Sequence, residues 1–512
     1  MAYGGVNGVK GTKQSELDKK YDKTGGIITG NVTIKGCVSE GENTVASGDN
    51  SHAEGKGTQA NGNYSHSEGS GVVADGNFSH AEGNDSEALG ESSHAEGYAT
   101  LAAGDFSHAE GGIDNSTNTT VCAHGIASHA EGEGTTTLAG AEASHAEGCG
   151  TLTEGKYSHA EGYKSMARGD SSHAEGRHTL ATAYCSHVEG LGTIASKECA
   201  HAEGQSTTAA GNNAHAEGHT TKAIEHCAHA EGSDTIASGD CAHAEGWGSQ
   251  AKGAYSHAGG GNTIANMYQT AIGKYNVEMS GAGSGDTLGS ALVIGNGTSY
   301  TRSNCFRVQF DGKTYAKGAY SSSGADYAEA FEWFDGNTQN EDRVGRFVTL
   351  VGEKIRIAKP TDDYILGIVS GNPSVLGDVH DDQWKDMYET DIFGRPILEE
   401  IEVPEVTSTI SIPHETRTEI VKTVVLQEKK KEIRQKLNPN YNNELEYIPR
   451  SQRPEWDAVG VVGKLVAIDD GTCNVDSWCT VGKDGIATSS EEQTRFRVMS
   501  RLDENHIKVF LV

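Results

Sequence analysis

Histidine and glutamate, two side chains that can exchange protons or bind metal ions, recur together along the first half of the chain. They lie in fifteen copies of a motif close to Ser-His-Ala-Glu-Gly, and the motif histidines are 14 residues apart almost throughout. A short fixed period indicates that each repeat is one rung of a stack, because one rung cannot bury its own faces. We therefore expect a ladder of side chains, represented by His52, Glu54, His94, Glu96, His187, Glu189, His201, Glu203, His243 and Glu245.

The elements that position this ladder can be read from one rung, SHAEGYATLAAGDF at residues 93–106. It divides into two halves of seven residues, each predicted to hold a five-residue strand that ends in glycine. Strand alternation puts Ser93 and Ala95 on the inward face and the His and Glu on the other face, and Gly97 supplies the positive φ of the turn. Two strands per 14 residues predict a narrow parallel β-roll with room inside only for Ser, Ala and Thr.

So thin an interior buries little apolar surface. At about 25 cal/mol per Å², the free energy gained by this burial hardly offsets the entropic cost of ordering the chain, about 1–2 kcal/mol per residue. We therefore expect lateral association into a homotrimer, with the His and Glu side chains forming a polar seam along the trimer axis. Two other interpretations stay open for the ladder: transition-metal binding by rings of histidine, and an outward-facing surface ladder. The structural seam is the prediction, with no metal site.

The repeat resembles, over residues 44 to 275, the head of the trimeric autotransporter adhesins. The resemblance implies a left-handed parallel β-roll with a 14-residue period and a trimeric assembly. In that family, one strand directs aliphatic residues toward the axis, whereas this chain has His and Glu at those positions.

Composition limits the possible functions. The net charge of −31 argues against nucleic acid and anionic membranes as partners, and no apolar stretch is long enough to span a bilayer. We expect no nucleic-acid binding, no membrane insertion, no signal peptide and no cofactor. The ten cysteines form no C-x-x-C pair and no zinc-binding spacing. Four of them stand two residues before a motif histidine, and we interpret these as small packing residues in a reducing cytosol: Cys185, Cys199, Cys227 and Cys241.

The chain changes character near residue 320, since all eight prolines lie beyond residue 359 and four of five tryptophans follow the repeats. Ahead of the repeats, residues 23–36 (KTGGIITGNVTIKG) resemble trimerising segments near the attachment end of phage tail-fibre proteins. After them, residues 264–325 predict a β neck with a hairpin at Asp311-Gly312. The segment LQEKKKEIRQKL, residues 426–437, predicts a short helix, and we expect an α+β domain at the C-terminus.

The segment GADYAEAFEW, residues 324–333, resembles the opening of the autoproteolytic intramolecular-chaperone domain of phage pre-neck appendage and tail-fibre proteins. The resemblance extends to residue 512, and it implies a cut between Ala325 and Asp326 with Asp326 and Glu329 as the catalytic residues. Such a reaction is a single-turnover self-cleavage with no external substrate.

Two carboxyl groups suit this chemistry, because one can activate water or attack the carbonyl while the other protonates the leaving amine. Gly324 allows backbone strain beside the bond. The rival is an N-to-O acyl shift at Ser321, Ser322 or Ser323.

Together these observations predict a mainly β chain of four segments: 1–43 for attachment and trimerisation, 44–263 for the repeat roll, 264–325 for the neck, and 326–512 for the chaperone domain. We expect a homotrimeric phage tail fibre or appendage, made in the host cytoplasm and located in the virion. Its N-terminus is expected to bind virion tail or baseplate components, and the fibre to bind a host surface receptor. The alternatives are a cell-surface adhesin and a polysaccharide-degrading tailspike.

Overall fold

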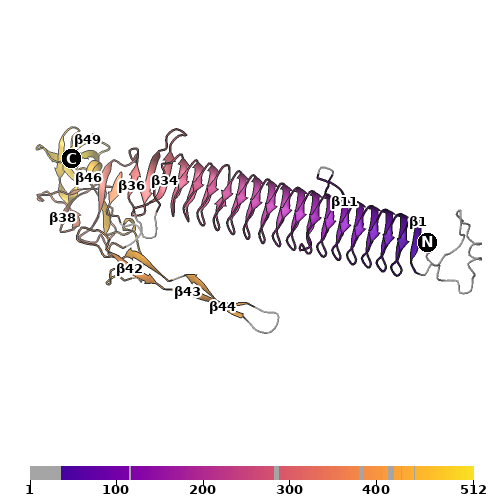
Figure 1. Cartoon of the computed structure of the whole chain (residues 1–512). Helices are drawn as coiled ribbons and strands as arrows, with labels where there is room; N and C mark the ends of the chain where they lie inside the picture. Colours follow the sequence, from indigo (N-terminus) through magenta and orange to yellow (C-terminus); the bar gives the residue numbers. More distant parts are fainter. Residues whose placement is uncertain are drawn as a thin grey trace, which may run out of the picture. The chain divides into compact units, whose positions relative to one another are not determined.

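The computed structural model divides the chain into two compact units, Met1–Gly318 and Ala319–Val512 (Figure 1), which are described one at a time. The described residues are 36–114, 117–281, 288–379, 384–404, 406–412, 420–427, 429–442 and 444–512. Most of the predicted attachment segment, residues 1–35, lies outside them. The finer limits at residues 43, 263 and 325 stay predictions.

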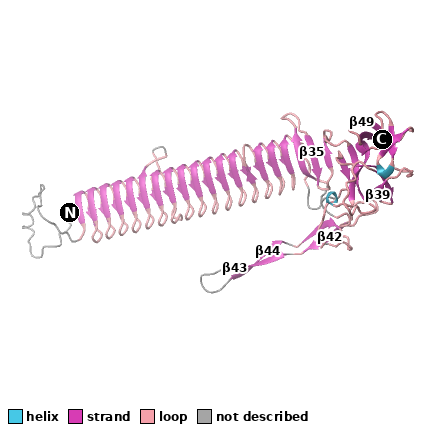
Figure 2. Ribbon diagram, turned by 180° about the vertical axis from the view of Figure 1, so that it is seen from behind, coloured by secondary structure: helices cyan, strands magenta, loops and turns pink. Residues whose placement is uncertain are grey.

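The first unit is a parallel β-solenoid in which each repeat adds one strand to each of two sheets (Figure 2). Strands of the first sheet begin at the motif histidine and span five residues, from β3 (His52–Lys56) to β31 (His257–Gly261), with β27 (His229–Ala230) as the short exception. Strands of the second sheet span two residues, from β2 (Val45–Ala46) to β32 (Ile264–Ala265). The parallel roll is confirmed, but the second strand is shorter than the five residues predicted.

Small inward side chains explain how the two sheets come so close. In the rung of residues 93–106, Ser93, Ala95 and Ala102 are buried, as predicted, and the Ser93 hydroxyl donates a hydrogen bond to the carbonyl three residues earlier at 2.8 Å. Gly97 has a φ of 110°, and a Cβ atom there would lie 2.1 Å from the carbonyl oxygen of Gly111 in the next rung. The motif glycine is therefore required both by its φ and by the spacing between rungs.

The solenoid ends in a small antiparallel extension of the first sheet. β33 (Thr270–Lys274) is the last strand that follows the repeat, and β34 (Ser290–Asn296) pairs with it in parallel. β35 (Asn304–Gln309) and β36 (Thr314–Ala316) then pair antiparallel, joined by a turn in which Gly312 has a φ of 84°. The hairpin predicted at Asp311-Gly312 is confirmed.

The second unit is built on a ten-stranded sheet around the long strand β46 (Trp456–Ile468). One group of buried side chains packs beside it, including Phe347, Ile368, Val498 and Ile507. The other strands of this sheet are β37 (Asp326–Glu332), β38 (Phe347–Val351), β39 (Lys354–Ile357), β40 (Gly367–Val369), β41 (Val375–Gly377), β47 (Trp478–Val481), β48 (Ala487–Ser490), β49 (Phe496–Arg501) and β50 (His506–Leu511).

The α+β class predicted for this unit is wrong. Within the described residues its helices are two three-residue 3₁₀ turns, η1 (Arg450–Gln452) and η2 (Lys483–Gly485). No helix in that described part is long and apolar enough to cross a membrane.

The helix predicted over residues 426–437 is replaced by strands. β44 (Ile420–Gln427) pairs with β43 (Val406–Ile412), and β45 (Lys430–Gln435) pairs with β42 (Leu398–Val403). Lys431 lies 2.6 Å from Glu400, and Arg434 lies 3.1 Å from Glu399. A basic segment is thus matched to an acidic strand distant in sequence, which local helix propensity cannot anticipate.

Candidate cleavage site and histidine ladder

The predicted cut lies where β37 begins and pairs antiparallel with β46. Asp326 lies opposite Gly463, and the register shifts between Tyr327 and Ala328. A Cβ atom on Gly463 would lie 2.6 Å from the Ala325 carbonyl oxygen, and one on Gly460 would lie 2.7 Å from Oδ2 of Asp326. Two glycines of β46 therefore make room for the Ala325–Asp326 segment to pack directly against that strand.

Backbone hydrogen bonds fix the Ala325–Asp326 peptide on both sides. The N–H of Lys464 donates to the Ala325 carbonyl oxygen at 3.1 Å, and the N–H of Ser374 donates to the Asp326 carbonyl oxygen at 2.7 Å. The first of these bonds polarises the carbonyl group that a nucleophile would attack. It is the type of donor that stabilises a developing oxyanion.

Gly324 is required for a different reason from the one predicted. Its φ lies outside the left-handed region, but a Cβ atom there would lie 2.4 Å from the backbone of Pro373 and Ser374. The glycine therefore permits close packing of two chain segments ahead of the bond, and the expectation of backbone strain at this residue is wrong.

The Asp326 carboxyl group is shielded from water. The residue is 5% exposed, and its Oδ2 atom has no hydrogen-bond partner within the described residues. Burial raises the pKa of this carboxyl above its usual range, and a hydrogen bond with the Ser370 side chain opposes part of that rise. The rise makes the protonated form, a proton donor next to its own backbone nitrogen, easier to reach than in an exposed aspartate.

Glu329 is not brought together with Asp326 in one chain. Residues three apart on a strand point to opposite faces, and along β37 Asp326, Ala328 and Ala330 are buried. Glu329 instead accepts a hydrogen bond from the Tyr327 hydroxyl at 3.0 Å. It lines a cleft of about 930 Å³ that sequence reasoning missed, whose walls include Trp384, Tyr441, Tyr447, Arg450, Arg453 and Trp456.

The cleft was missed because its parts are distant in sequence and share no motif. Arg450, nearly buried, lies over the Trp456 ring at 3.7 Å and forms an ion pair with Asp378 at 2.8 Å. The only sequence signal was the concentration of tryptophan and arginine after the repeats.

The serines of the rival interpretation lie in an exposed segment. Ser321, Ser322 and Ser323 are all exposed, and the Ser322 hydroxyl accepts a hydrogen bond from the N–H of Gly324 at 3.1 Å. That hydrogen bond stabilises a local turn, and it does not activate the hydroxyl as a nucleophile, because the N–H group is a donor and cannot accept the hydroxyl proton.

The histidines of the solenoid form a continuous stack on the outer face of the first sheet. Rings in consecutive rungs have centroids 4.7–5.0 Å apart and are close to parallel. The side chains are about one-third exposed, yet the Nε2 atoms are shielded and, except at His108, have no hydrogen-bond partner among the residues that the structure describes. His108 contacts Glu96 of the preceding rung at 3.2 Å.

The glutamates of the ladder influence one another's pKa. A hydrogen bond with Glu110 raises the pKa of Glu131 to about 7, and a hydrogen bond with Glu189 does the same for Glu203. Burial, followed by repulsion from neighbouring imidazoles, lowers the pKa of His129, His187 and His201, among others. Along the ladder the pKa of some glutamates is thus raised, while the pKa of these histidines is lowered.

The geometry therefore combines a β-solenoid rod with a β domain whose first strand carries a buried carboxyl group beside a polarised peptide bond. Residues 273–505 match the family model of Peptidase_G2, the IMC autoproteolytic cleavage domain. The match begins within β33, ahead of the predicted limit at residue 326.

Relatives extend this finding. The chain is 29% identical over 223 residues to the pre-neck appendage protein of Bacillus phage B103, which covers 43% of this chain and 21% of that protein. It is 31% identical over 177 residues to the putative phage-related protein YobO of Bacillus subtilis (strain 168), covering 34% and 19%. The chain thus spans about one fifth of the length of these curated relatives.

Among solved structures, the C-terminal fragment of bacteriophage phi29 gene product 12 is 25% identical to this chain, and the match covers 36% of this chain and 99% of that fragment, with a TM-score of 0.26.

The sequence matches show that this chain is homologous, over part of its length, to phage pre-neck appendage proteins.

Proposed function

We propose that this chain is a phage appendage or tail-fibre protein that assembles as a homotrimer and carries a C-terminal chaperone released by one cut between Ala325 and Asp326. The observation that carries the cut is the Lys464 N–H on the Ala325 carbonyl oxygen, 3.1 Å away, beside a buried carboxyl group. The IMC domain and the homology to pre-neck appendage proteins support the class of function.

The reaction is a hydrolysis. A water oxygen adds to the Ala325 carbonyl carbon, and the charge that develops on the carbonyl oxygen is stabilised by the Lys464 N–H. As the C–N bond breaks, the protonated Asp326 carboxyl group gives its proton to the departing backbone nitrogen of the same residue. The products are a carboxylate on Ala325 and a free amine on Asp326.

Glu329 is assigned the role of base for the attacking water, across a chain boundary. Because strand alternation directs it away from the Asp326 face of its own chain, it serves the bond of a neighbouring chain in the trimer. This arrangement couples the cut to assembly, since a lone chain lacks the complete set of groups.

Trimer formation is supported by the solenoid itself. Its interior consists mainly of Ala, Ser and Thr side chains, with a few valines such as Val188, and its outer face carries the polar ladder that we place along the trimer axis. Such an assembly places the N-terminal end on virion tail or baseplate components and leaves the rod to bind a host surface receptor. The protein is made in the host cytoplasm and becomes part of the virion.

Intact-mass spectrometry of the purified full chain tests the cut. We expect two fragments, one ending at Ala325 and one beginning at Asp326, and only full-length chains for Asp326→Ala and Glu329→Gln. Glu353→Gln, an exposed acidic residue that lines the same cleft, is the matched control and should cut normally. A wild-type trimer that stays uncut contradicts the proposal.

Mixed trimers test the role of Glu329 across chains. Coexpression of Asp326→Ala and Glu329→Gln chains should restore cutting of the Glu329→Gln chains alone, because they keep Asp326 and receive Glu329 from a neighbour. If neither chain is cut in trimers shown to be mixed, Glu329 acts within its own chain.

A further inference from the structure

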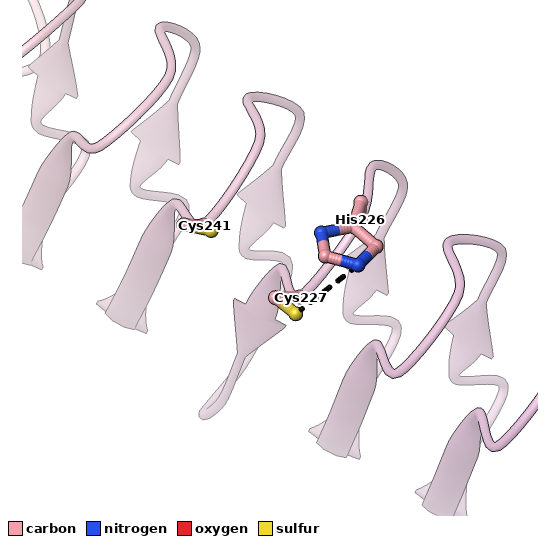
Figure 3. A group of neighbouring side chains, drawn as sticks. All are labelled: His226, Cys227 and Cys241. Atoms are coloured by element: carbon pink, nitrogen blue, oxygen red, sulfur yellow. Dashed lines mark hydrogen bonds between the residues drawn. The ribbon is translucent and has the colours of Figure 1, made fainter. Parts of the chain in front are cut away.

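A cluster of three potential metal ligands lies at one corner of the solenoid and includes none of the ladder residues. His226 and Cys227 are adjacent in one rung, and Cys241 occupies the position of Cys227 in the next rung (Figure 3). The Nε2 atom of His226 lies 3.6 Å from Sγ of Cys227, and all three ligand atoms lie within 4.8 Å of one another. All three residues are exposed, so the interpretation of Cys227 and Cys241 as packing residues is wrong.

The backbone fixes the spacing of these ligands. The N–H of Cys241 donates to the carbonyl oxygen of His226 at 2.8 Å, which ties the two rungs together at this corner. A tetrahedral zinc ion, with bonds of about 2.3 Å to sulfur and 2.0 Å to nitrogen, needs S···N separations of about 3.6 Å and S···S separations of about 3.8 Å. The observed His226–Cys227 distance already meets the first requirement, and small side-chain rotations supply the second.

The cluster lies beside a local irregularity of the solenoid. The rung between the two cysteines contains β27, the one strand of the first sheet's repeat region that spans two residues instead of five. The neighbouring rungs also carry Ala200, Ala214, Ala228 and Ala242 where most others carry the serine that donates a hydrogen bond to the preceding turn. Backbone hydrogen bonds to the next rung continue on both sides of this strand, from the N–H of His229 and of Ser233, and a side-chain bridge between rungs would add to them where the serine bond is absent.

We propose that His226, Cys227 and Cys241 bind one thiophilic divalent cation of the Zn²⁺ class, with two thiolates and one imidazole as protein ligands and water in the fourth position. Binding releases one proton from each thiol, since the thiolate is the metal ligand. The ion clips the rung of residues 226–227 to the rung of residue 241 and stabilises the solenoid across β27.

The chain contains its own matched control. Cys185 and Cys199 are related by the same 14-residue step and are also exposed, but Tyr184 stands where the first site has His226. The second pair offers two thiols without the imidazole. Metal binding at the second pair would mean that two exposed cysteines are enough, whereas binding only at the first site would mean that the histidine is needed as well.

Co²⁺ titration of the full chain, kept reduced with a phosphine, tests the proposal through the thiolate-to-cobalt charge-transfer absorption and the intense visible bands of tetrahedral Co²⁺. We expect one ion per chain, displaced by Zn²⁺, with the absorption lost in Cys227→Ser and Cys241→Ser and affinity reduced at least tenfold in His226→Asn. Cys185→Ser should leave the spectrum unchanged, and Tyr184→His should add a second site.

Circular dichroism of each variant establishes that the solenoid is intact, which is expected because the substituted side chains are exposed. Absence of thiolate absorption in the wild-type chain overturns the proposal, and so does absorption that survives in both Cys227→Ser and Cys241→Ser. Bound Co²⁺ with only weak octahedral bands, as from the His and Glu side chains of the ladder, overturns it as well.

Discussion

The solenoid and the C-terminal unit are stabilised by contacts of very different range. In the solenoid each strand pairs with an almost identical strand one repeat away, so that His187 lies beside His201 and Val188 beside Ala202. In the C-terminal unit β37 pairs with β46, so that Asp326 lies opposite Gly463, a residue far away in the sequence. A solenoid strand that slips by one rung meets a nearly identical partner strand and keeps most of its contacts. In the second unit each strand pairs with a strand of a different sequence, so a slip would lose the contacts.

Under the proposed function, this difference gives a physical reason for a folding partner in the same chain. Three solenoids that associate with a shift of one repeat keep nearly all their contacts, so the rod alone specifies its register weakly. The apolar core of the second unit, by contrast, specifies one fold without help. A domain that holds three chains in register during assembly and is then released by cleavage compensates for this weak specification of register.

The strongest test of the comparison is Gly190→Ala in the middle of the solenoid. Gly190 has a φ of 102°, and an added Cβ atom would lie 2.1 Å from the carbonyl oxygen of Gly204. Because backbone rather than a flexible side chain blocks the atom, we expect a loss of about 4 kcal/mol or more, measured by thermal unfolding.

Gly192→Ala is the matched control for this substitution. It lies in the same turn with a φ of 66°, and the nearest atom to an added Cβ is 3.9 Å away. Only the left-handed conformation is unfavourable there, at a cost of about 1 kcal/mol. Equal losses for the two variants would mean that spacing between rungs does not limit the solenoid.

Phe347→Ala should act on the other region. Phe347 is fully buried and packs edge-to-face against Phe496 at 4.8 Å, so its loss should destabilise the C-terminal unit by about 3–5 kcal/mol. We expect fewer correctly assembled trimers and less self-cleavage, while rods already cut should melt as in the wild type. Phe334→Ala, 63% exposed, is the control. A lower melting temperature of the cut rod in Phe347→Ala would contradict the separation of the two regions.

His201→Ala should have a smaller effect on the solenoid. The substitution removes stacking with His187 at 4.7 Å and with His215 at 4.8 Å, each worth about 1 kcal/mol. If the ladder lies along a trimer axis, dissociation measured by light scattering should also increase, and Gln250→Ala in β30 (Gln250–Ala251) should change neither quantity. If His201→Ala lowers the melting temperature without increasing dissociation, the ladder lies on the outer surface of the assembly.

Sequence reasoning succeeded where contacts are local. The 14-residue period, the inward Ser93 and Ala95, and the Asp311-Gly312 hairpin all follow from residues close in sequence, and all are confirmed. It failed over residues 426–437, because the acidic strand that captures this segment is distant in sequence. The strain expected at Gly324 was likewise wrong, because its neighbour Pro373 belongs to another segment.

The difference between local and distant contacts also explains which candidate catalytic and metal-binding residues could be predicted from the sequence. Asp326 and Glu329 were selected from a motif, but strand alternation separates their side chains in one chain, a consequence of β37 that the motif does not reveal. The ligand cluster at Cys227 and Cys241 was missed because its spacing matches no linear zinc motif. In a solenoid the relevant spacing is the repeat itself, so side chains 14 residues apart should be examined as neighbours.

The smallest predicted effect concerns protons in the ladder. The folded solenoid raises the pKa of Glu203 to about 7 from an ordinary 4.5, mainly through its hydrogen bonds with Glu189 and Glu217. A raised pKa means that the folded state holds the proton more tightly than the unfolded state, so this contribution is complete below pH 4.5 and is lost as pH rises to about 7. His187 and His201 act in the opposite sense, because their lowered pKa values make the folded state lose stability as pH falls below 6.5.

Glu203→Gln separates these two contributions. Glutamine keeps the protonated shape without a charge, so at pH 8 the variant should melt at a higher temperature than the wild type, by a few degrees at most, whereas at pH 4.5 the two should melt alike. The decline below pH 6.5 should remain, since the histidines are unchanged. Glu225→Gln, an exposed residue at a turn, should not distinguish the two pH values. If Glu203→Gln instead destabilises the solenoid at pH 8, the carboxylate is stabilised by charge rather than by a shared proton, and the ladder is an ion-pair array.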